Sequence, residues 1–419
     1  MKNFENRREK LFNMMKENSI AIIFAGVEKV LSEDATYPFE VNRSFYYLTN
    51  IKQSNSVLLL IKGIGENKTY LFVDEYNELK EKWIGRRLTY DEASLLSEVE
   101  NIYPRANLDS FIEMVFAKDN NIYGDIKDIY IDLTPEVKID DATSTHEYME
   151  KLLNKYPGTN VIDIKPIVTQ LRMVKNYFEV EKLRNAISLT NLGLNTLILK
   201  MKPGMYEYEL ADIFEFYGRT HSREGLAFPT ICASGKNATC LHYPTQNSQI
   251  KEDDLVLFDL GYVNEGYCAD ISRTYPVSGK FTGVKKDIYT AVLNCNKAVI
   301  NFIKSGKTIK ELQDFTVDFL KKECVRLGLM KDDEDIKKYY YHNISHHLGL
   351  DTHDASNREM PLQPGNVITV EPGLYFAQHN CGVRIEDDVL VTKDGCDVLS
   401  SDVPKEIADI EKLFSKVRG

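Results

Sequence analysis

The chain has 419 residues, of which 43% are hydrophobic and 27% charged, as in an ordinary globular protein long enough for two domains. A net charge of −11 without a dominant basic patch argues against nucleic-acid binding. The N-terminus lacks the apolar core of a signal peptide, and the apolar run at 20–27 is too short to span a bilayer, so no membrane partner is expected. Seven cysteines with no CxxC pair argue against a disulfide framework and favour the reducing cytoplasm.

The first part of the chain alternates predicted strands with helical or polar stretches. An amphipathic helix is predicted at 4–17 because its apolar residues recur at helical spacing. Strands alternating with helices favour an α/β layer domain. The predicted strands are residues 20–24, 56–62, 69–74, 128–133 and 160–164.

The pattern changes near residue 170. A long helix is predicted at 176–201, followed by a second at 206–219. From 255 onward the sequence predicts hairpins, then helices within 284–327, then hairpins again. We therefore predict an α/β (α+β) chain with two domains.

The predicted domains are residues 1–170 and 171–419. Seven of the eight histidines lie after residue 200, which indicates that the chemistry belongs to the second domain.

Two predicted hairpins each carry a pair of carboxylates. If the turn of the first is centred between Asn264 and Glu265, Asp259 faces Asp270, because opposite residues of a hairpin have a constant index sum. By the same argument Glu371 faces Glu386 in the second hairpin.

Facing side chains lie roughly 4.5–5.5 Å apart at Cβ, where like charges are destabilising. Both pairs have apolar neighbours in the sequence, and burying unpaired carboxylates is costly. Bound divalent cations would offset that cost, and two-metal sites use bridging carboxylates of this kind.

The stretch "HNISHHLGLDTHD" at 342–354 holds four histidines. It lacks the HExxH pattern of a helical zinc site, and Ser345 and Gly349 favour an extended or loop conformation. A site with four carboxylates needs about one imidazole for manganese, iron, cobalt or zinc. The alternation of side chains along a strand does not by itself choose between His346 and His347.

In order and spacing, "FDLGYVNEGYCADISRTY", "HHLGLDTHD", "VEPGLY" and "RIEDDVLVT" resemble the pita-bread metallopeptidases, and within them aminopeptidase P and prolidase. The resemblance covers essentially the whole chain. It implies a C-terminal pita-bread catalytic domain and two divalent metal ions, with manganese expected and zinc, cobalt or iron possible. The ligands implied by the resemblance are Asp259, Asp270, His346, Glu371 and Glu386, with Asp270 and Glu386 bridging.

The resemblance also implies residues that act on the substrate. His242 and His353 match histidines that contact the scissile carbonyl, and His342 matches the wall of the pocket for the proline ring. Tyr375 and Arg384 match residues that orient the carboxylates and the reacting groups, whereas His347 has no implied task.

The N-terminal half resembles the creatinase-like non-catalytic domain of the aminopeptidase P branch, through "NRREKLF", "NRSFYYLTNI" and "EKWIGRRL". This domain implies substrate restriction and assembly into a homodimer or homotetramer. One departure is Ser44, where some relatives carry an acid that would bind the substrate amine or a neighbouring subunit.

The implied reaction is metal-assisted hydrolysis that releases the N-terminal residue from peptides with proline in the second position. Glu371 would accept a proton from the attacking water and return it to the leaving nitrogen, while His242 and His353 stabilise the oxyanion. The alternative within the family is an Xaa-Pro dipeptidase, which must recognise a free carboxylate next to proline. The remote alternative is a non-catalytic binding module, and the complete ligand set argues against it.

Overall fold

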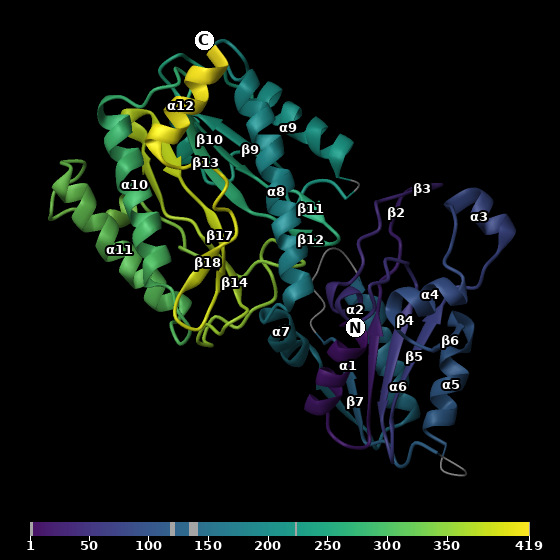
Figure 1. Cartoon of the computed structure of the whole chain (residues 1–419). Coiled ribbons are helices and arrows are strands. Elements are labelled where there is room, and N and C mark those ends of the chain that lie inside the picture. The colour runs from purple at the N-terminus through teal and green to yellow at the C-terminus, as the bar shows by residue number, and fades with distance from the viewer. Residues whose placement is uncertain (1–2, 118–121, 134–140, 223, 419) are drawn as a thin grey trace. The chain divides into compact units, whose positions relative to one another are not determined.

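The computed structural model describes residues 3–117, 122–133, 141–222 and 224–418 (Figure 1). The chain divides into two compact units, Met1–Arg172 and Met173–Gly419, and each is described by itself.

The first unit is built on a six-stranded mixed sheet with the order β6-β5-β4-β1-β7-β8. β1 pairs antiparallel with β4 and parallel with β7, so the sheet combines both strand directions. The small ribbon β2–β3 lies outside this sheet. The strands are β1 (Ser19–Phe24), β2 (Val30–Ser32), β3 (Ala35–Thr36), β4 (Val57–Lys62), β5 (Asn67–Val73), β6 (Asn101–Pro104), β7 (Asp128–Ile131) and β8 (Asn160–Asp163).

Helices cover the sheet of the first unit. Alternate residues of β1, β4, β5 and β7 pack against α5 and α6 in one apolar core, while α2 packs against β1 and β4. The central strands are therefore buried on both faces, which explains their continuous apolar runs. The helices are α1 (Asn3–Met14), α2 (Arg43–Thr49), α3 (Glu78–Ile84), α4 (Tyr90–Ser97), α5 (Leu108–Val115), α6 (Asp141–Lys155) and α7 (Lys165–Met173), with the 3-10 turn η1 (Arg105–Asn107).

The second unit has two helix pairs, α8 with α9 and α10 with α11, and β10, β13, β14, β17 and β18 lie between them (Figure 1). The capping box of Asn176 and Glu179 starts α8, because each side chain bonds the backbone N–H of the other. The helices and 3-10 turns are α8 (Tyr177–Lys200), α9 (Glu207–His221), η2 (Gly235–Thr239), α10 (Gly283–Phe302), α11 (Ile309–Arg326), η3 (Ile336–Lys338), η4 (Ala377–His379) and α12 (Ile407–Arg418).

The strands of the second unit form two three-stranded sheets, β13-β10-β9 and β14-β17-β18, and two short hairpins, β11-β12 and β15-β16. They are β9 (Ile231–Ser234), β10 (Leu255–Leu260), β11 (Val263–Asn264), β12 (Tyr267–Cys268), β13 (Ile271–Pro276), β14 (Val367–Val370), β15 (Gly373–Phe376), β16 (Cys381–Arg384), β17 (Asp387–Val391) and β18 (Cys396–Val398).

The predicted register of the first hairpin is wrong by two positions. Asp259 pairs with Ser272, not with Asp270. The reason is the turn: Glu265 and Gly266 both have positive φ, which forms a two-residue turn centred between them rather than one residue earlier. Asp259 and Asp270 are consequently diagonal neighbours on one face of the hairpin.

The predicted register of the second hairpin is confirmed. β14 pairs with β17 up to Val370 and Asp387, and β15 pairs with β16 from Gly373 and Arg384 onward. Both ladders keep the index sum that sets Glu371 opposite Glu386. The two glutamates lie between the ladders, where regular strand pairing is interrupted.

None of the helices in the described part of the chain combines the length and the apolar character that crossing a bilayer requires.

Candidate metal centre

Three buried groups from separate segments converge in the second unit. Asp270 follows β12, His346 lies in the loop before β14, and Glu386 precedes β17. One ligand atom from each lies within 4.8 Å of the others. Glu371 joins them, because its Oε1 lies 3.6 Å from His346 Nε2. The structure therefore gathers three of the four implied carboxylate ligands around the imidazole of His346.

The hydrogen bonds of His346 fix which ring nitrogen faces the carboxylates. Nδ1 lies 3.1 Å from the carbonyl oxygen of His347 and must donate to it. This leaves Nε2 to face the carboxylates, with Asp270 Oδ2 at 3.4 Å. A ring that donates one N–H to a backbone carbonyl and turns the other nitrogen to carboxylates is arranged as metal ligands are.

The carboxylates repel one another without a cation among them. Burial raises the pKa of Asp270 well above its usual value, and the charges of Asp259, Asp388 and Glu371 raise it further. Burial also raises the pKa of Glu386 well above its usual value, with the charge of Asp270 as the next cause. A divalent ion would remove this conflict, since its charge favours the ionised carboxylates.

The fifth implied ligand, Asp259, is held by Arg384. Arg384 Nη2 donates to Asp259 Oδ2 at 2.6 Å, and its Nε donates to Ser272 Oγ at 2.7 Å. Ser272 passes the contact on by donating to Glu386 Oε2 at 2.8 Å. Within the described residues, Asp259 Oδ1 is buried without a hydrogen-bond partner, which suits an oxygen that binds an ion. The donor set of carboxylates and one imidazole fits manganese, iron, cobalt or zinc.

His342 lies beside Glu371 and is neutral. Burial and the charge of Arg384 lower the pKa of His342 to about 3. Its Nδ1 donates to the carbonyl of Asn343 at 2.8 Å, so its Nε2 accepts from the Tyr375 hydroxyl, also at 2.8 Å. That hydroxyl in turn accepts from Arg384 Nη1 at 3.1 Å. Arg384 thus links Asp259, through the Tyr375 hydroxyl, to His342 beside Glu371.

Gly373 makes room for this arrangement. A Cβ at this position would collide with the Tyr375 hydroxyl and press on His342 Nε2. The glycine in "VEPGLY" is therefore required by close approach.

The remaining histidines differ in exposure. The exposed ring of His353 lies 4.3 Å from the ring of His346, edge to face. Desolvation lowers the pKa of His353, and the charges of His346 and His242 lower it further. His242 is exposed after η2, whereas His347 is buried and pairs its backbone with Ile368 in β14. The structure therefore turns His346, not His347, to the carboxylates.

Two hydroxyl residues that touch the carboxylates are absent from the sequence prediction. Ser272 contacts Glu386, and Thr369 Oγ1 lies 3.4 Å from Glu371 Oε1 while accepting the backbone N–H of His346. Each lies two residues from an implied ligand, so strand alternation puts it on the same face. This two-residue spacing from a ligand is the sequence signal that could have identified Ser272 and Thr369.

The site can hold divalent cations and bring a water, a carboxylate base and neutral imidazoles together, which defines a metal-dependent hydrolase. Comparison with known proteins agrees with this class. The pattern of metallopeptidase family M24 matches residues 181–393, and that of the aminopeptidase P N-terminal domain matches residues 4–123. The chain belongs to metallopeptidase family M24, with the N-terminal domain of the aminopeptidase P branch.

Individual relatives match over the full chain. The Xaa-Pro aminopeptidase of Haemophilus influenzae is 32% identical across 98% of this chain and 97% of its own length. A solved structure of a putative aminopeptidase P from Bacillus anthracis has a TM-score of 0.94 and 37% identity, covering 99% of both chains. The Escherichia coli aminopeptidase P solved with the inhibitor Pro-Leu has a TM-score of 0.89 and 32% identity, covering 99% of this chain and 98% of that one.

Proposed function

We propose that this metallo-aminopeptidase removes the N-terminal residue from peptides that carry proline in the second position. The observation that carries the proposal is the buried group of Asp270, His346, Glu371 and Glu386, which contains no cation of its own. Full-length similarity to Xaa-Pro aminopeptidases supports the choice of substrate, and the inhibitor Pro-Leu in the relative from Escherichia coli supports a proline pocket.

We propose two divalent ions as cofactors, with manganese expected. Asp259, Asp270 and Glu386 would hold one, and His346, Glu371, Asp270 and Glu386 the other. When bound, the ions lower the pKa of water and polarise a carbonyl oxygen. Zinc, cobalt and iron suit the same ligand types.

Glu371 is the proposed proton carrier. Its carboxylate lies beside His346 at the centre of the ligand group, where it can accept a proton from a water and release it again. It takes the proton of the attacking water and gives it to the proline nitrogen. The leaving group is a secondary amine, so this protonation is essential.

His353 and His242 are proposed to hydrogen-bond the scissile carbonyl and the negative charge that develops on it. The exposure of both rings leaves them accessible to a peptide. His342 is proposed to line the proline pocket, with Tyr375 and Arg384 fixing its ring.

Two substrates test the proposal. The enzyme is stripped of metal, reloaded with manganese, and assayed on an Xaa-Pro dipeptide and on the tripeptide that adds one residue after proline. We expect hydrolysis of the tripeptide with release of the first residue, and dependence on added metal. Hydrolysis confined to the dipeptide would contradict the aminopeptidase assignment and identify a dipeptidase. Full activity of the metal-stripped enzyme would contradict the metal centre.

We further propose that the chain acts in the cytoplasm as a homodimer or homotetramer. Exposed apolar side chains on β2 and α3 offer contact surface for self-association through the first unit. They are Val30, Leu31, Leu79, Trp83 and Ile84. The mass of the parent and of Trp83→Ser, measured by light scattering, tests the assembly, and a monomeric parent would contradict it.

A further inference from the structure

Strand pairing is interrupted where Glu371 and Glu386 lie, between the β14–β17 ladder and the β15–β16 ladder. Regular pairing stops after Val370 and Asp387 and resumes at Gly373 and Arg384. Backbone carbonyls in such a gap need donors from elsewhere, since buried polar groups must be satisfied. Side chains outside the two ladders supply them.

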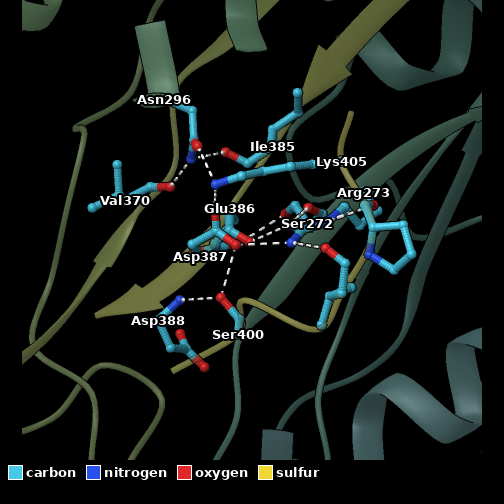
Figure 2. A network of polar contacts seen from close by, with 12 residues as sticks. Ser272, Arg273, Asn296, Val370, Ile385, Glu386, Asp387, Asp388, Ser400 and Lys405 are labelled. Carbon is cyan, nitrogen blue, oxygen red and sulfur yellow. Dashed lines mark hydrogen bonds and ion pairs between the residues drawn. The ribbon is translucent and has the colours of Figure 1, made fainter. Parts of the chain in front are cut away.

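Asn296 of α10 is one of these donors. It is fully buried, and its Nδ2 lies 3.2 Å from the carbonyl oxygen of Val370 and 3.4 Å from that of Ile385 (Figure 2). These two carbonyls belong to the residues directly before Glu371 and Glu386. A single amide therefore ties both strands at the point where each presents a carboxylate.

Arg273 of β13 is the other donor. Its guanidinium is fully buried, and Nη1 donates to the carbonyl of Glu386 and, at 3.0 Å, to the carbonyl of Ser272. This joins β13 to the segment that holds Glu386. The Ser272 side chain meets the Glu386 carboxylate on the opposite face, so the two segments are fixed through backbone and side chain alike.

Asp387 and Lys405 hold these donors in place. Asp387 accepts from Arg273 Nη2 at 2.8 Å and from Lys405 Nζ at 2.6 Å, and Ser400 adds a third bond at 2.7 Å. Lys405 also donates to Asn296 Oδ1 at 2.8 Å (Figure 2). Because Asn296 Oδ1 accepts from the lysine, its Nδ2 is oriented towards the two carbonyls.

We propose that Asn296 and Arg273 are positioning residues, which hold the backbone of Glu371 and Glu386 so that their carboxylates meet at the spacing the metal ions require. Neither residue touches substrate or the ligand atoms themselves. The inference rests on the proposed metal centre. It states that the network of Arg273, Asn296, Asp387 and Lys405 sets metal affinity as well as fold stability.

Asn296→Asp and Asn294→Asp form a matched pair that tests this. N296D keeps the acceptor for Lys405 but replaces the donor Nδ2 with an oxygen that faces two carbonyls. Asn294 lies on the same helix and donates to Glu323 Oε1 of α11 at 2.9 Å, so N294D makes the same chemical change away from the ligands. Each metal-free protein is titrated with manganese and with cobalt, and its unfolding temperature is measured before metal is added.

For N296D we expect about tenfold weaker metal binding, because supporting contacts of metal ligands typically carry 10–100-fold in affinity. The visible absorption of its cobalt form should also shift, which reports a changed coordination geometry. N294D should match the parent in affinity and spectrum even where it lowers the unfolding temperature. Parent-like affinity and spectrum in N296D, with only its unfolding temperature lowered, would overturn the inference.

Lys405→Met is the second variant, for the case in which N296D does not fold. It leaves the amide bonds possible but removes the contact that orients Asn296, so we expect metal affinity to fall in the same direction by a few-fold. Unchanged affinity in this variant would overturn the inference. Failure of the parent protein to bind either metal would instead overturn the proposed function.

Discussion

Glu386 and Asp387 are neighbours in the chain, yet they lie in opposite electrostatic surroundings. Glu386 faces Asp270, Glu371 and Asp259, and burial together with these like charges raises its pKa well above the usual value. For Asp387, burial alone would raise the pKa, but the charges of Arg273 and Lys405 hold it below its usual value. Alternation along the strand separates the two environments.

The difference distinguishes a metal site from a structural ion pair. On one face, buried carboxylates gather without enough cations, so an external cation completes the charge balance. On the other face, the buried Arg273 and the half-buried Lys405 already do so, and no metal is needed. Both sites contain buried carboxylates, so burial alone does not distinguish them. The structural site is recognised by the cationic side chains that pair with its carboxylate.

Among changes at the carboxylates of the metal site, Glu371→Gln should have the largest effect on turnover. The amide cannot carry a proton, so kcat should fall about 10³-fold, within the range of positioned acid–base groups. Steady-state kinetics on a proline-containing tripeptide, with metal content measured on the same sample, checks this. Turnover near that of the parent, with metal bound, would contradict the role of the base.

Among changes at the ion pair of Asp387 with Arg273 and Lys405, Asp387→Asn should have the largest effect on stability. It leaves the buried Arg273 and the half-buried Lys405 without their carboxylate, so the free energy of unfolding of the metal-free form should fall by about 3 kcal/mol, and that of the metal-loaded form by at least as much. Urea unfolding of the metal-free and metal-loaded forms measures it. Asp270→Asn is the matched control: it should remove metal stabilisation while leaving the metal-free form at least as stable as the parent. If both variants destabilise the metal-free form equally, the two faces do not differ as described.

Variants of two histidines should separate metal binding from turnover. His353→Ala should lower kcat about 100-fold with metal occupancy retained, as expected for loss of one hydrogen bond to the developing oxyanion. His346→Ala should lose metal instead, because its Nε2 faces the carboxylates. Metal analysis and kinetics on both variants decide the matter, and metal loss in the His353 variant would reverse the assignment.

The smallest expected effect is on the pH dependence of metal stabilisation. In the metal-free protein, burial and like charges raise the pKa of Asp270, Glu371 and Glu386. The folded form then binds more protons than the unfolded form above the usual carboxyl pKa, so its stability falls as pH rises through that window. Metal replaces these protons. Added manganese should therefore raise the unfolding temperature by a few degrees more at about pH 8 than at about pH 6, measured by calorimetry. Equal gains at both values would contradict the raised carboxyl pKa.

Sequence patterns predicted the second hairpin well and the first only in part. The polar turn of the second hairpin left one plausible centre, and the index sum of Glu371 and Glu386 holds in the ladders on either side. In the first hairpin, Asn264, Glu265 and Gly266 all suit a turn. Backbone twist selected the two-residue turn with positive φ at Glu265, which composition alone did not reveal.

The positioning residues Asn296 and Arg273 could not be predicted from the sequence, for a different reason. Asn296 stands in an ordinary amphipathic helix and Arg273 in an ordinary strand, so neither has a distinctive pattern. Their importance arises from carbonyls left free by an interruption between ladders more than 70 positions away in the chain. The choice of His346 over His347 came from family resemblance, and the tautomer of its ring became visible only with the backbone carbonyl in place.

The thiols of this chain offer a practical consequence. All seven cysteines are free, and Cys240 alone among them is exposed, two positions before His242. Burial raises the pKa of the Cys232, Cys295 and Cys324 thiols, which makes them slow to react with a maleimide. A fluorophore attached under mild conditions should therefore go to Cys240. The natural sequence therefore offers Cys240 as a labelling site near His242, whose ring is proposed to contact the peptide.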